Sequence, residues 1–68
     1  MSNEIEKYNK MLKEEYGENI TVEIKNNTDD DGNEYYYYIS AYKGDSESFE
    51  TVREAYDYAC MYLECLGF

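Results

Sequence analysis

Four consecutive tyrosines, residues 35–38, constrain the fold of this chain more than any other feature of its sequence. Tyrosine is a good strand former, and side chains alternate between the two faces of a strand. The four rings therefore cannot all face one way. We predict a strand from Glu34 to Lys43 with two unlike faces.

The residues that follow the tyrosines indicate which face is buried. The set at odd positions consists of Tyr35, Tyr37, Ile39 and Ala41. The set at even positions consists of Tyr36, Tyr38, Ser40 and Tyr42. We expect the odd set to face the helices because Ile39 and Ala41 are aliphatic. The even set would then place three tyrosines on the open face of the sheet.

Two further strands are expected around this one. Strict alternation of apolar and polar residues predicts a half-buried strand from Ile20 to Lys25. Residues 26–33 lack an apolar side chain and are rich in Asn, Asp and Gly, which is typical of a turn or loop. After a tight turn at residues 43–46, a short third strand is expected from Ser46 to Phe49, with Phe49 inward.

Two helices are predicted at the ends of the chain. In the first, Asn3 to Tyr16, Asn3 and Glu6 have the spacing of a capping box. Its apolar stripe consists of Ile5, Tyr8, Leu12 and Tyr16. The second helix begins at a capping box formed by Thr51 and Glu54 and ends at Gly67. Its apolar stripe consists of Val52, Ala55, Tyr56, Ala59, Leu63 and Leu66.

These elements predict one acidic α+β domain that spans residues 1–68. A small antiparallel sheet of two to three strands would carry both helices on one face, in the order α-β-β-(β)-α. This arrangement would bury the two helical stripes together.

The residue inventory argues against catalysis and cofactors. The chain has no His and no Gly-rich phosphate loop, and its serines have no evident base, so we expect neither an enzyme nor a zinc site. Cys60 and Cys65 lie five residues apart, about 140° around one helix, so we expect free thiols. No apolar segment approaches ~18 residues, and no secretory signal is visible, so we expect a cytoplasmic protein without a membrane partner.

The segment Asp29-Asp30-Asp31-Gly32-Asn33-Glu34 resembles part of an EF-hand calcium loop. With Gly32 at position six, the first ligand would be the neutral amide of Asn27. Position twelve, which should be a bidentate Glu, is Tyr38. We therefore predict no metal site, and a calcium-responsive module remains an alternative.

Net charge indicates the class of partner. Sixteen acidic and six basic residues give −10, and residues 26–68 alone carry ten acids and two bases, or −8. Such a field repels nucleic acid and acidic membranes and attracts basic surfaces. Carboxylates spaced along a face imitate phosphates, because Lys and Arg bind both groups with similar geometry. The expected partner is a basic nucleic-acid-binding protein.

Two groups of residues are candidates for partner contact. The carboxylates are Asp29, Asp30, Asp31, Glu34, Asp45, Glu47, Glu50, Glu54 and Asp57. The aromatic candidates on the expected open face are Tyr36, Tyr38 and Tyr42. The outward side of the last helix adds Tyr58, Met61 and Cys65, which indicate a contact surface. The alternative function is a non-mimetic interaction module, such as a homodimer formed through Tyr58, Met61 and Tyr62.

Two resemblances to known families add to these expectations. The stretch Gly44 to Tyr58, with Phe49-Glu50-Thr51-Val52-Arg53-Glu54-Ala55 at its centre, is similar to the sheet-to-helix joint of three-strand-plus-helix domains in phage-type integrases. Those domains lay their sheet on DNA through basic and polar residues. The acidic sheet edge here implies that the topology carries over and DNA binding does not.

The second resemblance is to the small acidic anti-CRISPR proteins of phages. Size, charge and the helix–sheet–helix order fit that group, and Asp31-Gly32-Asn33-Glu34-Tyr35 looks like a hairpin in one such inhibitor. The resemblance implies a phage DNA-mimic inhibitor in the cytoplasm of a bacterial host cell. Its carboxylate surface would dock in the basic channel of a CRISPR effector nuclease that normally binds duplex DNA or the PAM.

Overall fold

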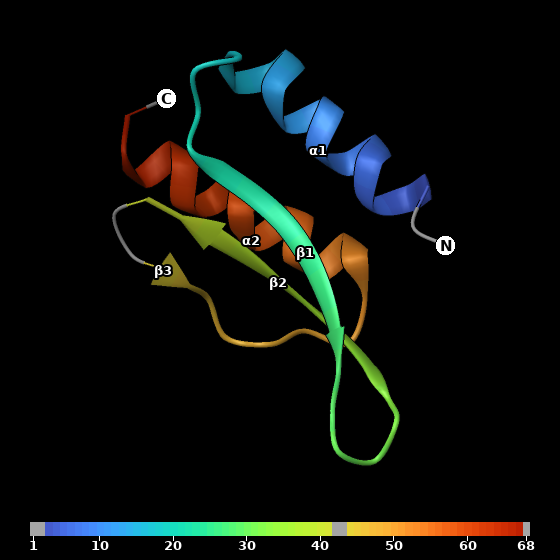
Figure 1. Cartoon of the computed structure of the whole chain (residues 1–68). Coiled ribbons are helices and arrows are strands. Elements are labelled where there is room, and N and C mark those ends of the chain that lie inside the picture. Colours follow the sequence, from blue (N-terminus) through green and yellow to red (C-terminus); the bar gives the residue numbers. More distant parts are fainter. Residues whose placement is uncertain (1–2, 42–43, 68) are drawn as a thin grey trace.

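The computed structural model describes the backbone of residues 3–41 and 44–67, and their side chains from Glu4 on. The elements are α1 (Asn3–Tyr16), β1 (Val22–Thr28), β2 (Glu34–Ser40), β3 (Gly44–Asp45) and α2 (Val52–Cys65). The three strands form one antiparallel sheet in the order β1-β2-β3. The predicted α+β fold is confirmed, and the third strand, which the prediction left open, is present and gives the order α-β-β-β-α. The helices pack together on one side of the sheet, and the β1–β2 hairpin extends beyond them (Figure 1).

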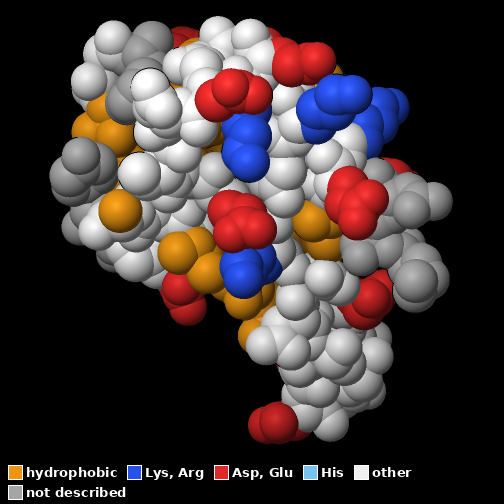
Figure 2. Space-filling view, turned by 45° about the horizontal axis from the view of Figure 1, so that its top comes forward, with side chains coloured by type: hydrophobic (Ala, Val, Ile, Leu, Met, Phe, Trp, Pro, Cys, Tyr) orange, Lys and Arg blue, Asp and Glu red, His pale blue; other side chains and the backbone are white. Residues whose placement is uncertain are grey.

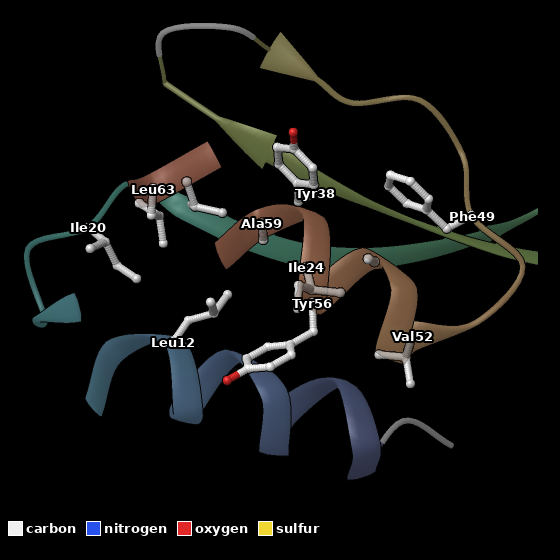
Figure 3. Close-up of a cluster of buried hydrophobic side chains, with 11 residues drawn as sticks. Leu12, Ile20, Ile24, Tyr38, Phe49, Val52, Tyr56, Ala59 and Leu63 are labelled. Atoms are coloured by element: carbon white, nitrogen blue, oxygen red, sulfur yellow. The ribbon is translucent and has the colours of Figure 1, made fainter. Parts of the chain in front are cut away.

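The core lies between the sheet and the two helices (Figure 3). Leu12 of α1, Ile24 of β1 and Leu63 of α2 are its largest fully buried side chains. The predicted stripes of both helices face this core, except that Leu66 is 46% exposed. Leu66 follows the last residue of α2, so it no longer continues the buried side of the helix.

The caps of α2 follow the sequence prediction. The Thr51 hydroxyl accepts a hydrogen bond from the Glu54 backbone N–H at 3.2 Å, as expected of an N-cap. Gly67 has a φ of +94°, a left-handed conformation that ends a helix at little cost for Gly. The predicted partner of Glu6 in α1, the Asn3 side chain, lies outside the described residues.

The first strand differs from its predicted bounds. It begins at Val22 instead of Ile20 and continues through residues 26–28, which we predicted as loop. The hairpin explains the extension, because Asn26, Asn27 and Thr28 pair with the start of β2. Main-chain pairing holds these polar residues in the sheet although no apolar side chain marks them.

The faces of β2 are opposite to our prediction. Tyr38 is 5% exposed and Ser40 is 2% exposed, and Tyr36 packs against the core. The outer face carries Tyr35, Tyr37 and Ile39, each half-buried.

Pairing with β1 is the physical reason for this reversal. Val22 and Ile24, the buried residues of β1, lie opposite Ser40 and Tyr38 and therefore share their face. The buried hydroxyl of Ser40 lies 2.7 Å from the Tyr62 hydroxyl in α2, so its burial leaves a hydrogen bond in place. Ala41 follows the end of β2, and Tyr42 and Lys43 lie outside the described residues.

The third strand is also shifted, to Gly44–Asp45 in place of the predicted Ser46–Phe49. Ile39 pairs with Asp45, and farther along the strand Tyr36 pairs with Phe49. Three steps along β2 thus correspond to four along residues 45–49, and the additional residue forms a β-bulge. The bulge turns Phe49 inward, as predicted, while Asp45 stays on the outer face.

An asparagine of α1 covers part of the free edge of β1. The Asn9 side chain accepts the Ile24 N–H through Oδ1 at 2.7 Å and donates to the Ile24 carbonyl through Nδ2 at 3.1 Å. It therefore takes the place of a neighbouring strand and blocks pairing with another chain at this point. None of the sequence patterns pointed to this role of Asn9.

Candidate protein-interaction surface

The outer face of the sheet is the side that the two helices leave uncovered. Tyr35, Tyr37 and Ile39 form its central row, and the Tyr35 and Tyr37 ring centroids lie 5.9 Å apart. Glu23, Lys25 and Asn27 of β1 pair with these residues and lie on the same face. We call this surface the outer face below.

A shallow hollow lies on the outer face beside the tyrosines. The bulge makes room for it, because residues 46–48 leave the regular ladder between the two β-pairs. Ser46 stays attached to β2 by accepting the Tyr38 N–H through Oγ at 3.0 Å. The hollow is lined by Asn27, Tyr35, Tyr37, Asp45, Ser46 and Ser48.

A second hollow adjoins the first at the sheet edge. It shares Tyr35 and Ser48 with the first hollow and is lined in addition by Asp29, Asn33, Glu34, Phe49 and Glu50. Among the described residues, neither lining contains a Lys or an Arg. We call the two hollows together the tyrosine groove. It combines tyrosine rings with four of the nine predicted carboxylates.

The hairpin tip holds the remaining two predicted aspartates of the loop, Asp30 and Asp31, both exposed. Asp29 has a structural role there, because its Oδ1 accepts the backbone N–H groups of Asp31 and Asn33, each at 2.9 Å. In Figure 2 the hairpin projects from the lower edge and ends in an acidic side chain, and the visible Lys and Arg side chains lie above it. The hairpin tip therefore presents exposed carboxylates, those of Asp30 and Asp31, at the end of this projection.

Within the described part of the chain, no three His, Cys, Asp or Glu side chains are placed to hold a metal ion. The aspartates of the hairpin are instead arranged around a turn, with Gly32 at φ +85°.

The other predicted carboxylates are dispersed. Glu47 is exposed within residues 46–48, and Glu54 accepts a hydrogen bond from the Thr51 hydroxyl at 3.3 Å. Asp57 lies on the exposed side of α2, where it forms an ion pair with Arg53 at 3.4 Å. The fold therefore brings Asp29, Glu34, Asp45 and Glu50 to one groove and leaves Glu54 and Asp57 on a separate helix.

The aromatic candidates change with the reversed faces. Tyr38 is buried and Tyr36 packs against the core, so neither can supply the open contact area we predicted. Tyr42 lies outside the described residues. Tyr35 and Tyr37, which we expected inside, take this position on the outer face. The length of the hairpin loop could have identified them. Because five residues, 29–33, connect the strands, even positions of β1 pair with even positions of β2 and share one face, which leaves the odd positions on the other face.

A separate apolar surface lies on α2. The exposed large hydrophobic residues of the described chain are Tyr58, Met61 and Leu66, at 45%, 59% and 46% exposure. Tyr58 stacks on Phe49 with ring centroids 4.8 Å apart, which links this surface to the segment that borders the tyrosine groove. Cys65 is exposed and Cys60 half-buried, and both are free thiols as predicted.

Two tyrosine hydroxyls form hydrogen bonds between α1 and α2. Tyr16 donates to the Glu64 carboxylate at 3.0 Å, and Tyr56 donates to the Glu15 carboxylate. Burial, together with hydrogen bonds to Cys60 and these carboxylates, raises the pKa of both phenols above the ordinary value. As donors to carboxylates on the other helix, both phenols hold α1 against α2.

No helix of the described chain is both long and apolar enough to cross a lipid bilayer. No protein-family model, curated protein or solved structure matches this chain.

Proposed function

We propose that this chain binds a basic nucleic-acid-binding site on a partner protein and blocks it by offering carboxylates in place of phosphates. The observation that carries the proposal is the tyrosine groove, where four carboxylates lie around tyrosine rings with no Lys or Arg among the described lining residues. Tyrosine supplies contact area at low entropic cost, and carboxylates accept charge-assisted hydrogen bonds from Lys and Arg.

Charge distribution supports the same proposal. Residues 26–68, which include the groove and the hairpin tip, carry −8 of the net −10. A field of this sign accelerates association with a basic surface and suppresses contact with nucleic acid itself. A site that evolved for phosphates is therefore the favoured partner.

The specific partner we propose is a CRISPR effector nuclease, with this chain acting as a phage anti-defence inhibitor in the bacterial cytoplasm. The support for this choice is the resemblance of size, charge and hairpin sequence to acidic anti-CRISPR proteins. A basic channel that holds a nucleic-acid duplex through its backbone accepts regularly placed negative charge.

The proposal is tested by capturing partners from a bacterial lysate on the immobilised chain and eluting them with DNA or with salt, followed by mass spectrometry. We expect a nucleic-acid-binding protein that DNA displaces, with weaker retention at high salt because exposed charges are screened beyond about 8–10 Å. A charge-neutralised variant, Glu34→Gln with Asp45→Asn, should retain less of it than a Glu4→Gln, Glu14→Gln variant with the same net charge. A partner indifferent to DNA and salt would refute the proposal.

The apolar surface of α2 favours a second candidate, a non-mimetic module that forms a homodimer through Tyr58 and Met61. Light scattering at increasing protein concentration measures this directly. A dimer that Met61→Asp dissociates would support the second candidate, and a monomer at high concentration would exclude it.

A further inference from the structure

We propose that the outer-face hollow of the tyrosine groove binds an arginine side chain of the partner, with its guanidinium lying on the Tyr37 ring and pairing with Asp45. This inference rests on the proposed function and names the contact that the partner supplies. The uncovered outer face holds this hollow, which is lined by two tyrosines, Asp45 and two serines among other residues.

The outer face carries aromatic side chains on the side of the sheet that the two helices leave uncovered. The helices pack against the opposite face of the sheet, where Tyr38 and Ser40 are buried. Tyr35 and Tyr37 are half-buried by their strand neighbours and by each other, with ring centroids 5.9 Å apart. Paired, half-covered rings of this kind offer rigid contact area to a partner.

The hollow supplies two kinds of contact for a planar cation. Asp45 pairs with Ile39, two residues along β2 from Tyr37, so Tyr37 and Asp45 are diagonal cross-strand neighbours about 7–8 Å apart on the same face. A guanidinium group on the Tyr37 ring is therefore within reach of the Asp45 carboxylate. Ser46 and Ser48 line the same hollow and add hydroxyl oxygens as acceptors.

Arginine fits this combination better than lysine. Its planar guanidinium stacks on an aromatic ring and still directs several N–H donors at a carboxylate, whereas the ammonium group of lysine is a compact, strongly hydrated charge. The groove is open and acidic, so it suits a weakly hydrated cation on a flexible stem. The adjoining hollow, with Asp29, Glu34 and Glu50, provides negative charge for a second basic side chain of the same partner.

Charge also argues against a second copy of this chain as the occupant. Each copy carries −10, and its described arginine, Arg53, already pairs with Asp57. The charged groups on the outer face of the described strands are Glu23, Lys25 and Asp45. Lys25 of β1 pairs with Tyr37, and its positive charge repels a cation bound on that ring. Removal of the Lys25 charge should therefore strengthen binding.

The test titrates the ¹⁵N-labelled full chain with the blocked peptide Gly-Arg-Gly-Arg-Gly, followed by amide chemical shifts. The titration is done in about 0.1 M salt, which screens the attraction between charges more than about 10 Å apart. The binding that remains then reflects contacts near the peptide rather than the net charge of the chain. We expect saturable shifts centred on β2 and residues 45–48. Peptides with lysine or with neutral citrulline in place of arginine should bind more weakly, the lysine peptide by about two- to fivefold.

Matched variants identify the two contacts. Tyr37→Leu should weaken binding by about two- to fivefold, and Tyr37→Phe, which keeps the ring, should not. Asp45→Asn should weaken it by about two- to fivefold, whereas Glu14→Gln removes the same charge from α1 and should have little effect. Lys25→Gln should increase affinity. Each variant is compared by its amide spectrum, so that a loss of fold is distinguished from a loss of contact.

Three outcomes would overturn the inference. They are shifts centred on α2 or the hairpin tip, equal affinity for the arginine and lysine peptides, and shifts in β2 that grow with protein concentration alone, which would indicate a second copy. The capture experiment separates this inference from the proposed function. If a DNA-displaced partner binds Tyr37→Leu as tightly as the original chain, the arginine site is wrong and the function stands. If the peptide binds as expected but no such partner is captured, the function is wrong and the site stands.

Discussion

Two hydrogen bonds join the Asn9 side chain to the backbone of Ile24 in β1. Removing them tests directly whether Asn9 covers the free edge of the sheet. Asn9→Ala removes two hydrogen bonds to the Ile24 backbone, at 2.7 and 3.1 Å, in a partly buried position. A net contribution near 1 kcal/mol for each bond gives a loss of about 2 kcal/mol. Alanine recovers about 0.5 kcal/mol through its higher helix propensity in α1. The expected net loss is therefore about 1.5 kcal/mol.

A loss of this size is large for a chain of 68 residues. At 4–8 °C per kcal/mol, Tm should fall by about 6–12 °C. Urea unfolding followed by far-UV circular dichroism measures the free energy, and an unchanged m-value shows that the exposed surface on unfolding is the same. Hydrogen exchange adds a local readout, because the Ile24 amide should lose its protection.

The control for this experiment is Asn19→Ala, which truncates an exposed asparagine in the connection between α1 and β1. Its stability should stay within about 0.5 kcal/mol of the original chain, as is usual for surface changes. If Asn9→Ala loses no more than Asn19→Ala, or if the Ile24 amide stays protected, then Asn9 does not cover the edge of β1 in solution.

Three further predictions follow from the core, the cap of α2 and the two phenols that bond α1 to α2. Tyr38→Ala should cost about 3–5 kcal/mol because it empties a core position, whereas Tyr37→Ala should cost much less, and equal losses in denaturant unfolding would contradict the assignment of the two faces. Thr51→Ala should lower stability by about 1 kcal/mol and Thr51→Ser should preserve it, as measured by thermal unfolding; equal Tm values for the two would show that the cap is not needed. Burial raises the pKa of Tyr16 and Tyr56, so these phenols lose their protons at lower pH in the unfolded chain than in the folded one. Their contribution to the free energy of unfolding should therefore be fully present below the unfolded pKa, near 10, and should fall as pH rises above it. The double variant Tyr16→Phe, Tyr56→Phe should flatten this decline in alkaline unfolding curves, and an unchanged slope would assign the decline to other groups.

The sequence by itself determined the elements whose signals are local. The apolar stripes predicted both helices, because the spacing of apolar residues within one segment is enough to indicate a helix with one buried side. The Thr51–Glu54 capping box fixed where α2 begins, because an N-cap bond joins residues three positions apart. The alternation after Ile20 and the tyrosine run predicted two strands, and the polar run between them predicted their hairpin. The acidic character of residues 26–68 is likewise a property of the sequence alone.

Tertiary structure decided which residues of β2 lie on the outer face of the sheet and which lie in the core. Alternation divides the tyrosines into two sets but does not say which set is buried, and the aliphatic side chain of Ile39 pointed to the wrong one. The five-residue loop sets the register of β1 on β2, and the buried Val22 and Ile24 then carry Tyr38 and Ser40 inward with them. A hydroxyl of α2, from Tyr62, makes the burial of Ser40 possible.

The candidate site shows the same division between local and long-range information. The sequence supplied the carboxylates, but the fold decides which of them line the tyrosine groove: the β1–β2 hairpin places Asp29 and Glu34 there, and the bulged segment between Asp45 and Phe49 places Asp45 and Glu50. A bulge depends on how two segments match across the sheet, and Asn9 meets Ile24 only after α1 has packed against β1. Contacts of this kind join residues far apart in the chain, so local sequence patterns carry no trace of them.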